Sequence, residues 1–563
     1  MRAAHLGDFT LTARTLLITA VALVIGGASA VAAFCLLRLI GLITNGVFYQ
    51  RLSTAMTAPG LVRHPAWLIL LAPVAGGLIV GLMARYGSEK IRGHGMPETI
   101  DAIVTGGSKV SPRVAVLKPI SAAVSIGTGG PFGAEGPIIM TGGAVGSILA
   151  QCLHLSADER KALLVAGAAG GMAATFNAPL ASILLAVELL LFEWRPRSLI
   201  PVCAAVTVAT ACRWSLLGTA TLFPVSGVIR PDAGAIALTL IPGLSGGLLA
   251  VIATALVYKS EDTFARLPLH WMWWPAIGGL IIGVGGLFDP RALGVGYDVI
   301  DTLLTGRAGM SLIVGILVVK TLIWSLSLGS GTSGGVLAPT FMIGGALGAL
   351  EGRALPHVFA GFWAMAGLAA VVGGVMRSPL TGIVFTMELT GAWDALLGLL
   401  VASVSAYTLS ALVLKRSVLT EKVARRGIHL TREYSTDPLE VFFAREVMTP
   451  APPPGTEPAR PEPAATAGQP RVTVYADSTL REVANEFARR HATAAAVADR
   501  EVPGRVVGRI TLGQLLHARR EDLREEEHRE RPLPVVRIPS ALPRPGRPAR
   551  ETREEEDDTV RPG

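Results

Sequence analysis

An internal repeat with a spacing of about 200 residues constrains the fold of this chain more than any other feature of its sequence. Five ordered blocks return at offsets of 200 to 202 residues. The first copies are Gly76 to Gly81, Gly93 to Asp101, Lys118, Met140 to Gly146, and Ala166 to Leu189, and the second copies begin at Gly278, Gly294, Lys320, Met342 and Ala366. Self-similarity at a fixed period indicates a duplicated structural unit. We therefore predict a first repeat over 60–260 and a second over 270–425, which includes the final helix.

The repeated part is far more apolar than a soluble domain. Charged residues make up 16% of the chain and hydrophobic residues 51%, against roughly 25% charged in ordinary soluble proteins. Of the first 420 residues 44 are charged (26 basic and 18 acidic), whereas 48 of the remaining 143 are charged, with 24 of each sign. The composition therefore excludes a soluble enzyme and predicts a membrane protein with a polar tail. The basic surplus fits cytoplasmic loops, so no nucleic acid partner is expected.

Several apolar stretches have the roughly 20 residues that a membrane-spanning helix needs. They include 15–37, 66–84, 234–258, 308–327 and 394–414. The segment 1–59 allows two interpretations, because Ala28-Ser29-Ala30 resembles a signal-peptidase site. The apolar run is longer than a typical secretory signal. We therefore interpret it as the first membrane helix of a multi-pass protein in the plasma (inner) membrane, in contact with lipid.

Two apolar runs are too short to cross a bilayer. They follow Pro137 and Pro339, cover 138–151 and 340–350, and each begins after a glycine-rich segment. Proline at a first turn is compatible with a helix that starts there. Duplicated bundles with broken helices are typical of transporters, whose substrate site lies near the midplane of the membrane.

Glu135 precedes the first of these short helices. Helix N-termini carry a partial positive charge and attract anions, so an ionised carboxylate there competes with a mobile anion. Protonation removes that attraction, which predicts a gate that acid opens. The alternative is that Glu135 only caps its own helix. Ionisable residues inside a membrane are costly and usually functional, which favours the gate.

Three glycine- and proline-rich blocks resemble those of the CLC chloride channels and proton-coupled chloride exchangers, over about residues 10–425. The resemblance implies an all-α, multi-pass, inverted-repeat core with broken helices, and a homodimer with one path for chloride or another small anion in each subunit. It makes Glu135 the gating residue. The residues that it places around the anion are Gly93, His94, Gly95, Met96, Pro97, Gly133, Ala134, Gly136, Pro137, Gly335, Val336, Leu337, Ala338 and Pro339.

The chain departs from the family pattern at several positions. His94 replaces the usual serine of the first block; its imidazole either donates a hydrogen bond to the anion or turns away, leaving only backbone donors. Leu419 takes the place of the inner-gate tyrosine, with Tyr407 as a weaker candidate. Leu189 replaces the inward-facing glutamate that exchangers commonly use.

The remaining acids and lysines of the membrane part have less specific roles. Glu188 has a repeat counterpart in Glu388, which favours a structural role. Glu193 or an internal water chain is left as a route for protons, and Glu98 is assigned a solvated or structural role. Lys118 and Lys320 either raise the potential along the anion path or extend to a membrane interface.

The polar tail contains a small α/β module. Residues 450–470 form a proline-rich linker, which should be extended, and 521–563 should be disordered. Between them, 471–517 predict strand, helix, two strands and a helix, with strands at 494–498 and 505–510. Residues 441–517 resemble one copy of a CBS module, interrupted by the linker and on the cytoplasmic side. Such modules can bind adenine nucleotides; no other cofactor and no metal is expected.

The sequence thus favours passive chloride conduction through a path gated by Glu135. Proton-coupled exchange of chloride or fluoride is the alternative. A remote alternative is an intramembrane serine protease, because Gly331-Thr332-Ser333-Gly334 fits its nucleophile motif. That chemistry requires a histidine base nearby, and the next histidine, His357, falls in a predicted loop.

Overall fold

The computed structural model describes residues 11, 13–426, 439, 442–451, 472–500, 502, 504–516 and 520. Two compact units divide the chain, one of residues 7–434 and one that contains the described residues from 439 onward. Most of the predicted linker and the whole predicted tail 521–563 lie outside the described residues.

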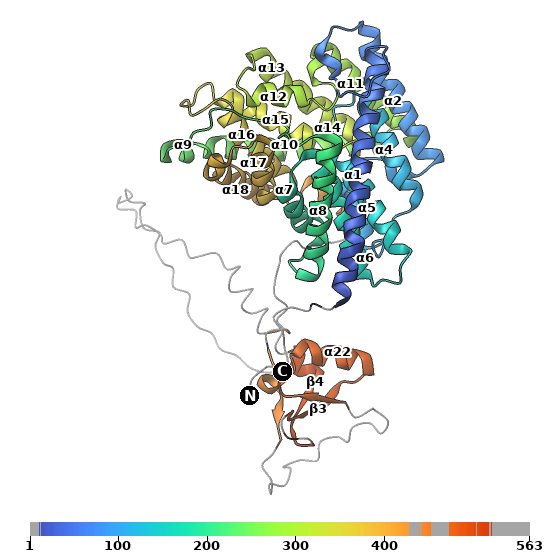
Figure 1. Ribbon diagram of the computed structural model, residues 1–563, viewed down its shortest axis with the longest axis vertical. Coiled ribbons are helices and arrows are strands. Elements are labelled where there is room, and N and C mark those ends of the chain that lie inside the picture. The colour runs from blue at the N-terminus through green and yellow to red at the C-terminus, as the bar shows by residue number, and fades with distance from the viewer. Residues whose placement is uncertain are drawn as a thin grey trace, which may run out of the picture. The chain divides into compact units, whose positions relative to one another are not determined.

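The larger unit is helical and begins with α1 (Ala13–Phe48), which continues through Ala30 without a break. The helices of the first repeat are α2 (Ala66–Tyr86), α3 (Met96–Val104), α4 (Pro112–Gly127), α5 (Glu135–Gln151), α6 (Ala157–Phe176), α7 (Pro179–Leu185) with the π-helical η3 (Ala186–Leu191), α8 (Pro196–Leu217), α9 (Ala233–Leu238) and α10 (Leu240–Ala265). In Figure 1, α1 runs beside α8, α5 and α6, and it packs on all three.

The second repeat follows the same order of elements. Its helices are α11 (Trp274–Phe288), α12 (Tyr297–Leu304), α13 (Met310–Gly315) with the π-helical η6 (Ile316–Lys320), α14 (Thr321–Gly329), α15 (Leu337–Glu351), α16 (Phe362–Met376), α17 (Pro379–Thr390), α18 (Leu396–Val413) and α19 (Val418–Arg425). Short 3-10 turns occur at Pro59–Leu61, Glu89–Ile91, Trp271–Trp273, Pro290–Ala292 and Trp393–Ala395.

Helices long and apolar enough to cross a membrane contain all the spans predicted from sequence, apart from two residues at the start of 308–327. They are Ala13–Phe48, Ala66–Tyr86, Pro196–Leu217, Ala233–Ala265, Trp271–Phe288, Met310–Gly329 and Trp393–Arg425. The broken helices α5 and α15 have 17 and 15 residues, so neither has the roughly 20 residues that a full crossing requires.

Reciprocal contacts show that the two repeats are related by an approximate two-fold axis. The Glu188 carboxylate accepts hydrogen bonds from the backbone N–H groups of Leu380 and Thr381, at 3.3 and 2.9 Å, at the start of α17. The Glu388 carboxylate accepts from the N–H groups of Leu180 and Ala181, at 3.0 and 2.9 Å, at the start of α7. Each repeat therefore supplies the acid that satisfies a helix end of the other.

Glycines allow α2 and α11 to touch along their backbones. A Cβ on Gly77 would overlap the carbonyl of Pro275, and one on Gly279 would overlap the carbonyl of Pro73. Small residues at helix crossings let backbones approach closely inside a membrane, where packing rather than the hydrophobic effect holds helices together. These repeat-related glycines therefore fix the crossing between the two halves.

The smaller unit is a four-stranded sheet with one long helix. Its elements are α21 (Ala444–Val447), β1 (Thr449–Pro450), β2 (Thr473–Tyr475), α22 (Leu480–Arg490), β3 (Ala494–Ala498) and β4 (Val506–Thr511), with strand order β1-β4-β3-β2. β2 and β3 are parallel and the other pairs antiparallel. α22 buries Leu480, Val483 and Phe487 in the core of the unit. The predicted α/β segment is confirmed. So is the predicted succession of strand, helix, strand and strand along the chain, which is β2, α22, β3 and β4.

We predict that Gly279→Ala lowers the free energy of unfolding by about 1–3 kcal/mol, because the added methyl group overpacks the α2–α11 crossing. The measurement is thermal unfolding of the purified protein in detergent. Gly46→Ala in α1 is the matched control, since a Cβ there meets nothing within 4 Å. Equal stability of the Gly279 and Gly46 variants would show that the close crossing is not required.

Candidate functional site

The three glycine-rich blocks that sequence predicted around the anion meet in the interior of the larger unit. The Gly93 N–H donates to the Thr332 carbonyl at 3.1 Å, and the Gly335 N–H donates to the Gly133 carbonyl at 2.7 Å. The residues of the three blocks are all buried: Gly93, His94, Gly95, Met96, Pro97, Gly133, Ala134, Gly136, Pro137, Gly335, Val336, Leu337, Ala338 and Pro339. Segments far apart in sequence therefore form one site.

Close backbone approach explains why glycine stands at the centre of these blocks. A Cβ on Gly136 would overlap the carbonyl oxygen of His94, and a Cβ on Gly95 would lie 2.7 Å from the carbonyl oxygen of Gly136. Gly95 also has a positive φ of 85°, which residues with a Cβ rarely adopt. The first and second blocks thus pack backbone against backbone, without room for side chains between them.

Glu135 binds the N-terminus of the broken helix in the opposite repeat. Its Oε1 accepts hydrogen bonds from the backbone N–H of Leu337 and, at 3.2 Å, from that of Ala338, at the start of α15. Its Oε2 is buried without a hydrogen-bond partner in the described part of the chain. The sequence predicted a carboxylate at a helix N-terminus, but it pointed to α5, of which Glu135 is the first residue. The carboxylate bonds found here come from α15 instead.

Lys118 binds the backbone at the start of the first glycine block. Its ammonium donates to the carbonyls of Ile91 and Gly93, at 2.9 and 2.7 Å, and to Ser333 Oγ at 3.2 Å. The side chain is fully buried. The ammonium therefore holds the chain at the start of the first block and joins it to Ser333, in the segment that precedes the third block.

Lys320 does the same in the second repeat. Its ammonium donates to the carbonyls of Ala292 and Gly294, at 2.9 and 2.7 Å, and it is also fully buried. The interpretation that these lysines extend to a membrane interface is wrong for both. Their donors satisfy backbone carbonyls inside the unit, of which that of Gly93 also accepts from the Gly334 N–H at 3.4 Å.

Glu98 is buried, so of the solvated or structural role assigned to it the solvated alternative is wrong and the structural one fits. Its side chain is 4% exposed, and its Oε2 accepts from the Gly95 N–H at 3.1 Å, which caps α3. Its Oε1 pairs with the ammonium of Lys422 at 2.9 Å and with the guanidinium of Arg426 at 3.3 Å. Arg426 also pairs with Asp101 at 2.8 Å. These pairs attach α19 to α3.

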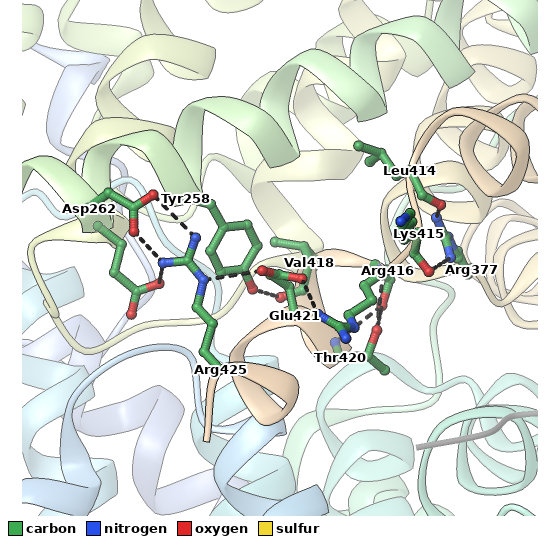
Figure 2. A network of polar contacts seen from close by, with 12 residues as sticks. Tyr258, Asp262, Arg377, Leu414, Lys415, Arg416, Val418, Thr420, Glu421 and Arg425 are labelled. Carbon is green, nitrogen blue, oxygen red and sulfur yellow. Dashed lines mark hydrogen bonds and ion pairs between the residues drawn. The ribbon is translucent and has the colours of Figure 1, made fainter. Parts of the chain in front are cut away.

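A second set of polar contacts fixes the other side of α19 (Figure 2). Arg425 pairs with Asp262 at 2.5 Å and with Glu421 at 3.2 Å, and the Tyr258 hydroxyl donates to the Val418 carbonyl. Both Tyr258 and Asp262 belong to α10. Helix α19 is therefore held between α3 and α10.

The inner-gate candidates lie in different environments. Leu419 is fully buried in the first turn of α19, where the resemblance placed the gate residue. Tyr407 lies in α18 and is 36% exposed. His94 is buried, and its Nδ1 has no hydrogen-bond partner within the described residues. An apolar side chain thus occupies the start of α19, at the position where the resemblance put Leu419 in place of the family's tyrosine.

The two positions predicted for a proton path, Leu189 and Glu193, also have different surroundings. Leu189 is buried in η3. Glu193 lies just beyond η3, accepts a hydrogen bond from Ser198 Oγ at 2.7 Å and faces the ammonium of Lys161 at 3.6 Å. Glu193 is therefore a partly exposed acid that is already paired.

The protease alternative is not supported by the surroundings of Ser333. Its Oγ lies 3.0 Å from Ser121 Oγ and 3.2 Å from the Lys118 ammonium. That ammonium also donates to two carbonyls, and no histidine is among the hydrogen-bond partners of Ser333 in the described part of the chain. His357 is exposed in the loop between α15 and α16, as the sequence predicted.

Comparisons with known proteins agree with this arrangement. The profile of the family described as "Voltage gated chloride channel" matches residues 76–411. The chain is 31% identical over 373 residues to the "Voltage-gated ClC-type chloride channel ClcB" of Salmonella typhimurium, covering 64% of this chain and 88% of the relative. It is 28% identical to the "Putative chloride channel protein ClcB-like" of Ralstonia nicotianae, covering 64% and 86%.

Solved structures share the fold. A slow cyanobacterial Cl−/H+ antiporter aligns with a TM-score of 0.63 at 22% identity, over 74% of this chain and 99% of the other. A CLC-type fluoride/proton antiporter aligns with a TM-score of 0.59 at 19% identity, over 71% and 97%. The chain therefore belongs to the voltage-gated chloride channel family, as a multi-pass membrane protein with the inverted-repeat CLC fold and CLC-type chloride transport.

Sequence reasoning missed the residues that hold α19. Lys422 and Arg426 are four residues apart and so share a helix face, and Glu98 follows Gly95 at the three-residue spacing of a capping box. These local signals are present in the sequence. The pairing of Lys422 and Arg426 with Glu98, more than 300 residues away in the chain, has no such signal.

We predict that Lys118→Met lowers the free energy of unfolding by about 1–3 kcal/mol, because the buried Ile91 carbonyl loses its hydrogen-bond donor. Thermal unfolding in detergent measures the effect. The matched control is Lys161→Met, whose lysine is 22% exposed and forms a long ion pair with Glu193 at 3.6 Å, so its stability should change by less than about 1 kcal/mol. The prediction is wrong if the two variants unfold together.

Proposed function

We propose that this chain conducts chloride passively across a membrane, along a path that Glu135 closes when ionised and opens when protonated. The contact between the Glu135 carboxylate and the N–H groups of Leu337 and Ala338 carries the proposal. These donors lie at the positive end of the α15 dipole, which suits an anion. A carboxylate that occupies them excludes chloride from the same donors.

The proposed anion path uses backbone donors of the three glycine blocks. Glycine and proline leave these backbone groups uncovered by side chains, and the buried setting strengthens each electrostatic contact. His94 adds either an imidazole donor or only its backbone N–H. Leu419 at the start of α19 offers no hydroxyl, so the inner end of the path differs from the family pattern.

The preference for passive conduction rests on Leu189. An alkyl side chain cannot carry a proton, and it is buried where exchangers of the family commonly have an acid. Proton-coupled exchange of chloride or fluoride is the second candidate, because two solved proteins with this fold are a Cl−/H+ antiporter and a fluoride/proton antiporter. Their identity to this chain is 22% and 19%, which supports the fold and not the coupling.

The proposal extends to the assembly and its setting. By resemblance to the family, the chain forms a homodimer with one path per subunit in the plasma (inner) membrane, in contact with lipid. Its α/β unit lies on the cytoplasmic side as a CBS-like module, with an adenine nucleotide as the ligand class that such modules bind. The described sheet and α22 are compatible with that module.

We predict that Glu135→Gln abolishes the activation of chloride flux by acid. Wild-type flux in liposomes should rise between about pH 7.5 and pH 4.5 as the carboxylate is protonated, whereas the variant should change by less than about twofold. The physical reason is that the uncharged amide no longer holds the α15 N-terminus as an anion does. Ionophore-dependent chloride efflux from loaded liposomes is the measurement.

Asp394→Asn is the matched control, because Asp394 is an exposed acid in a 3-10 turn of the larger unit. Its flux should keep the full response to acid. A Glu135→Gln variant that keeps the wild-type response would place the gate on another group. Wild-type liposomes without chloride flux would reject the proposed function itself.

We also predict that a chloride gradient drives little uphill proton movement, because Leu189 interrupts the usual inward proton route. A pH electrode in weakly buffered liposome suspension measures this directly. Strong proton movement that is lost in Glu193→Gln would establish coupling through Glu193. Strong movement that persists in that variant would establish a different proton route, and both results contradict passive conduction.

A further inference from the structure

Two side-chain oxygens near the gate are buried without a hydrogen-bond partner in the described part of the chain. One is Oε2 of Glu135, and the other is the hydroxyl oxygen of Tyr297, the first residue of α12. A buried polar group without a partner costs free energy. The anion path proposed above explains the bonds of Glu135 Oε1 and leaves these two oxygens unexplained.

Tyr297 lies close enough to Glu135 for the carboxylate charge to act on its hydroxyl. Burial and the negative charge of Glu135 both raise the pKa of the Tyr297 hydroxyl, so it keeps its proton and remains a donor. The segments that lead into α12 and α5 are also joined, because the Gly294 N–H donates to the Gly129 carbonyl at 3.1 Å. The start of α12 therefore lies beside the segment that carries Glu135.

Aromatic neighbours hold the Tyr297 ring in place. Phe176 and Phe223 pack edge-on against it, with ring centroids 6.3 and 5.9 Å away. Phe176 in turn contacts Phe385 at 5.1 Å, and Phe385 contacts Phe341 of α15 at 5.2 Å. The ring thus belongs to a packed aromatic group that reaches α15. These contacts use the ring alone and leave the hydroxyl without a partner.

A cavity lies at the start of α12. Its volume is about 110 Å³, and Tyr297 and Asp298 line it together with the end of α1 and the turn Pro59–Leu61. It accommodates a few waters, since one water occupies about 30 Å³ in the liquid. Asp298 is exposed. Tyr297 therefore borders both this cavity and the buried site of Glu135.

We propose that Tyr297 is a positioning residue, whose hydroxyl receives the Glu135 side chain when protonation releases it from α15. This inference rests on the proposed gate. An ionised carboxylate prefers the helix N-terminus, because that end carries a partial positive charge. A protonated carboxyl group loses this attraction and gains an O–H donor beside its carbonyl acceptor. A phenol hydroxyl also donates and accepts, so the two groups match each other.

Other charged groups act on this pair and have to be separated from it. Lys320 of η6 acts on Glu135, and Asp298 of α12 acts on Lys320 in turn. The ammonium of Lys320 is held by two carbonyls, which the variants below leave unchanged. Further titratable groups on neighbouring elements are Asp301 of α12, Lys118 of α4 and His94 of the first block.

The first measurement is the pH of half-maximal chloride efflux from liposomes that contain the full-length protein. Tyr297→Phe should lower this pH by about 0.5–1 unit, the size of one net hydrogen bond, because the open state loses its partner. The variant keeps the ring contacts with Phe176 and Phe223. Its unfolding temperature should therefore stay at the wild-type value.

Tyr49→Phe is the matched control. It removes the same hydroxyl from a tyrosine that donates to the Ala58 carbonyl, and it should leave the pH of half-maximal efflux unchanged. The shift caused by Tyr297→Phe should also persist in an Asp298→Asn background, which excludes titration of Asp298 as its cause. An unshifted Tyr297→Phe, or an equal shift in Tyr49→Phe, would overturn the inference.

A Glu135→Ala background makes the test specific to the gate. No carboxyl group is left for Tyr297 to receive, so Tyr297→Phe should change the flux of that background by less than about 1.5-fold. A hydroxyl that binds the anion itself, or that only stabilises the fold, would change the flux in both backgrounds. Such a result would overturn the role assigned to Tyr297.

A structure of Glu135→Gln tests the inference without any flux. The neutral amide has a donor and an acceptor, as the protonated acid does. The variant side chain should leave the α15 N–H groups and lie within hydrogen-bond distance of the Tyr297 hydroxyl. A side chain that stays on α15 or binds another group would contradict the inference. Wild-type flux that is absent or indifferent to acid would reject the proposed function, and this structure would still decide the role of Tyr297.

Discussion

The hydrogen bonds from the N-terminus of α15 to the Glu135 carboxylate are the interaction on which the rest of the larger unit depends. A helix end leaves backbone N–H groups unpaired, and inside a membrane no water is available to satisfy them. The protein brings a carboxylate from the opposite repeat to those donors. Three other features bring the two helix ends together. They are the glycines of the three blocks, the buried lysines Lys118 and Lys320, and the crossing of α2 and α11.

Function arises where the repeats stop being alike. Glu188 and Glu388 exchange equivalent contacts, and Lys118 and Lys320 hold equivalent carbonyls. Glu135 breaks this symmetry, because the residue at the matching position, 202 residues later, is Leu337. The first repeat thus supplies the anionic acceptor and the second supplies the donors. A symmetric pair of acids would repel each other, and a symmetric pair of leucines would leave the donors to chloride at every pH.

The sequence predicted the parts of this architecture that depend on local pattern. The repeat indicated two equivalent bundles, the short apolar runs after Pro137 and Pro339 became α5 and α15, and the strands at 494–498 and 505–510 became β3 and, shifted by one residue, β4. These features follow from apolar length, proline and glycine positions, and β propensity, which act over a few residues.

Contacts between distant residues could not be predicted in the same way. The carboxylate of Glu135 was expected at α5 and binds α15. Glu98 was given a solvated or structural role and is buried, and Lys118 was allowed to reach an interface and is enclosed. In each case a partner 25 to more than 300 residues away decides the outcome. Burial makes such pairing obligatory, but spacing along the chain does not say which group supplies it.

The most direct test of the account is to locate a heavy halide by anomalous diffraction from crystals grown in bromide near pH 7.5, in the wild type and in Glu135→Gln. The account predicts a bromide within hydrogen-bond distance of the Leu337 and Ala338 N–H groups in the variant. The Glu135 carboxylate should hold those donors in the wild type. Bromide on those N–H groups in the wild type, or none there in the variant, would contradict the claim that carboxylate and anion compete for one helix end.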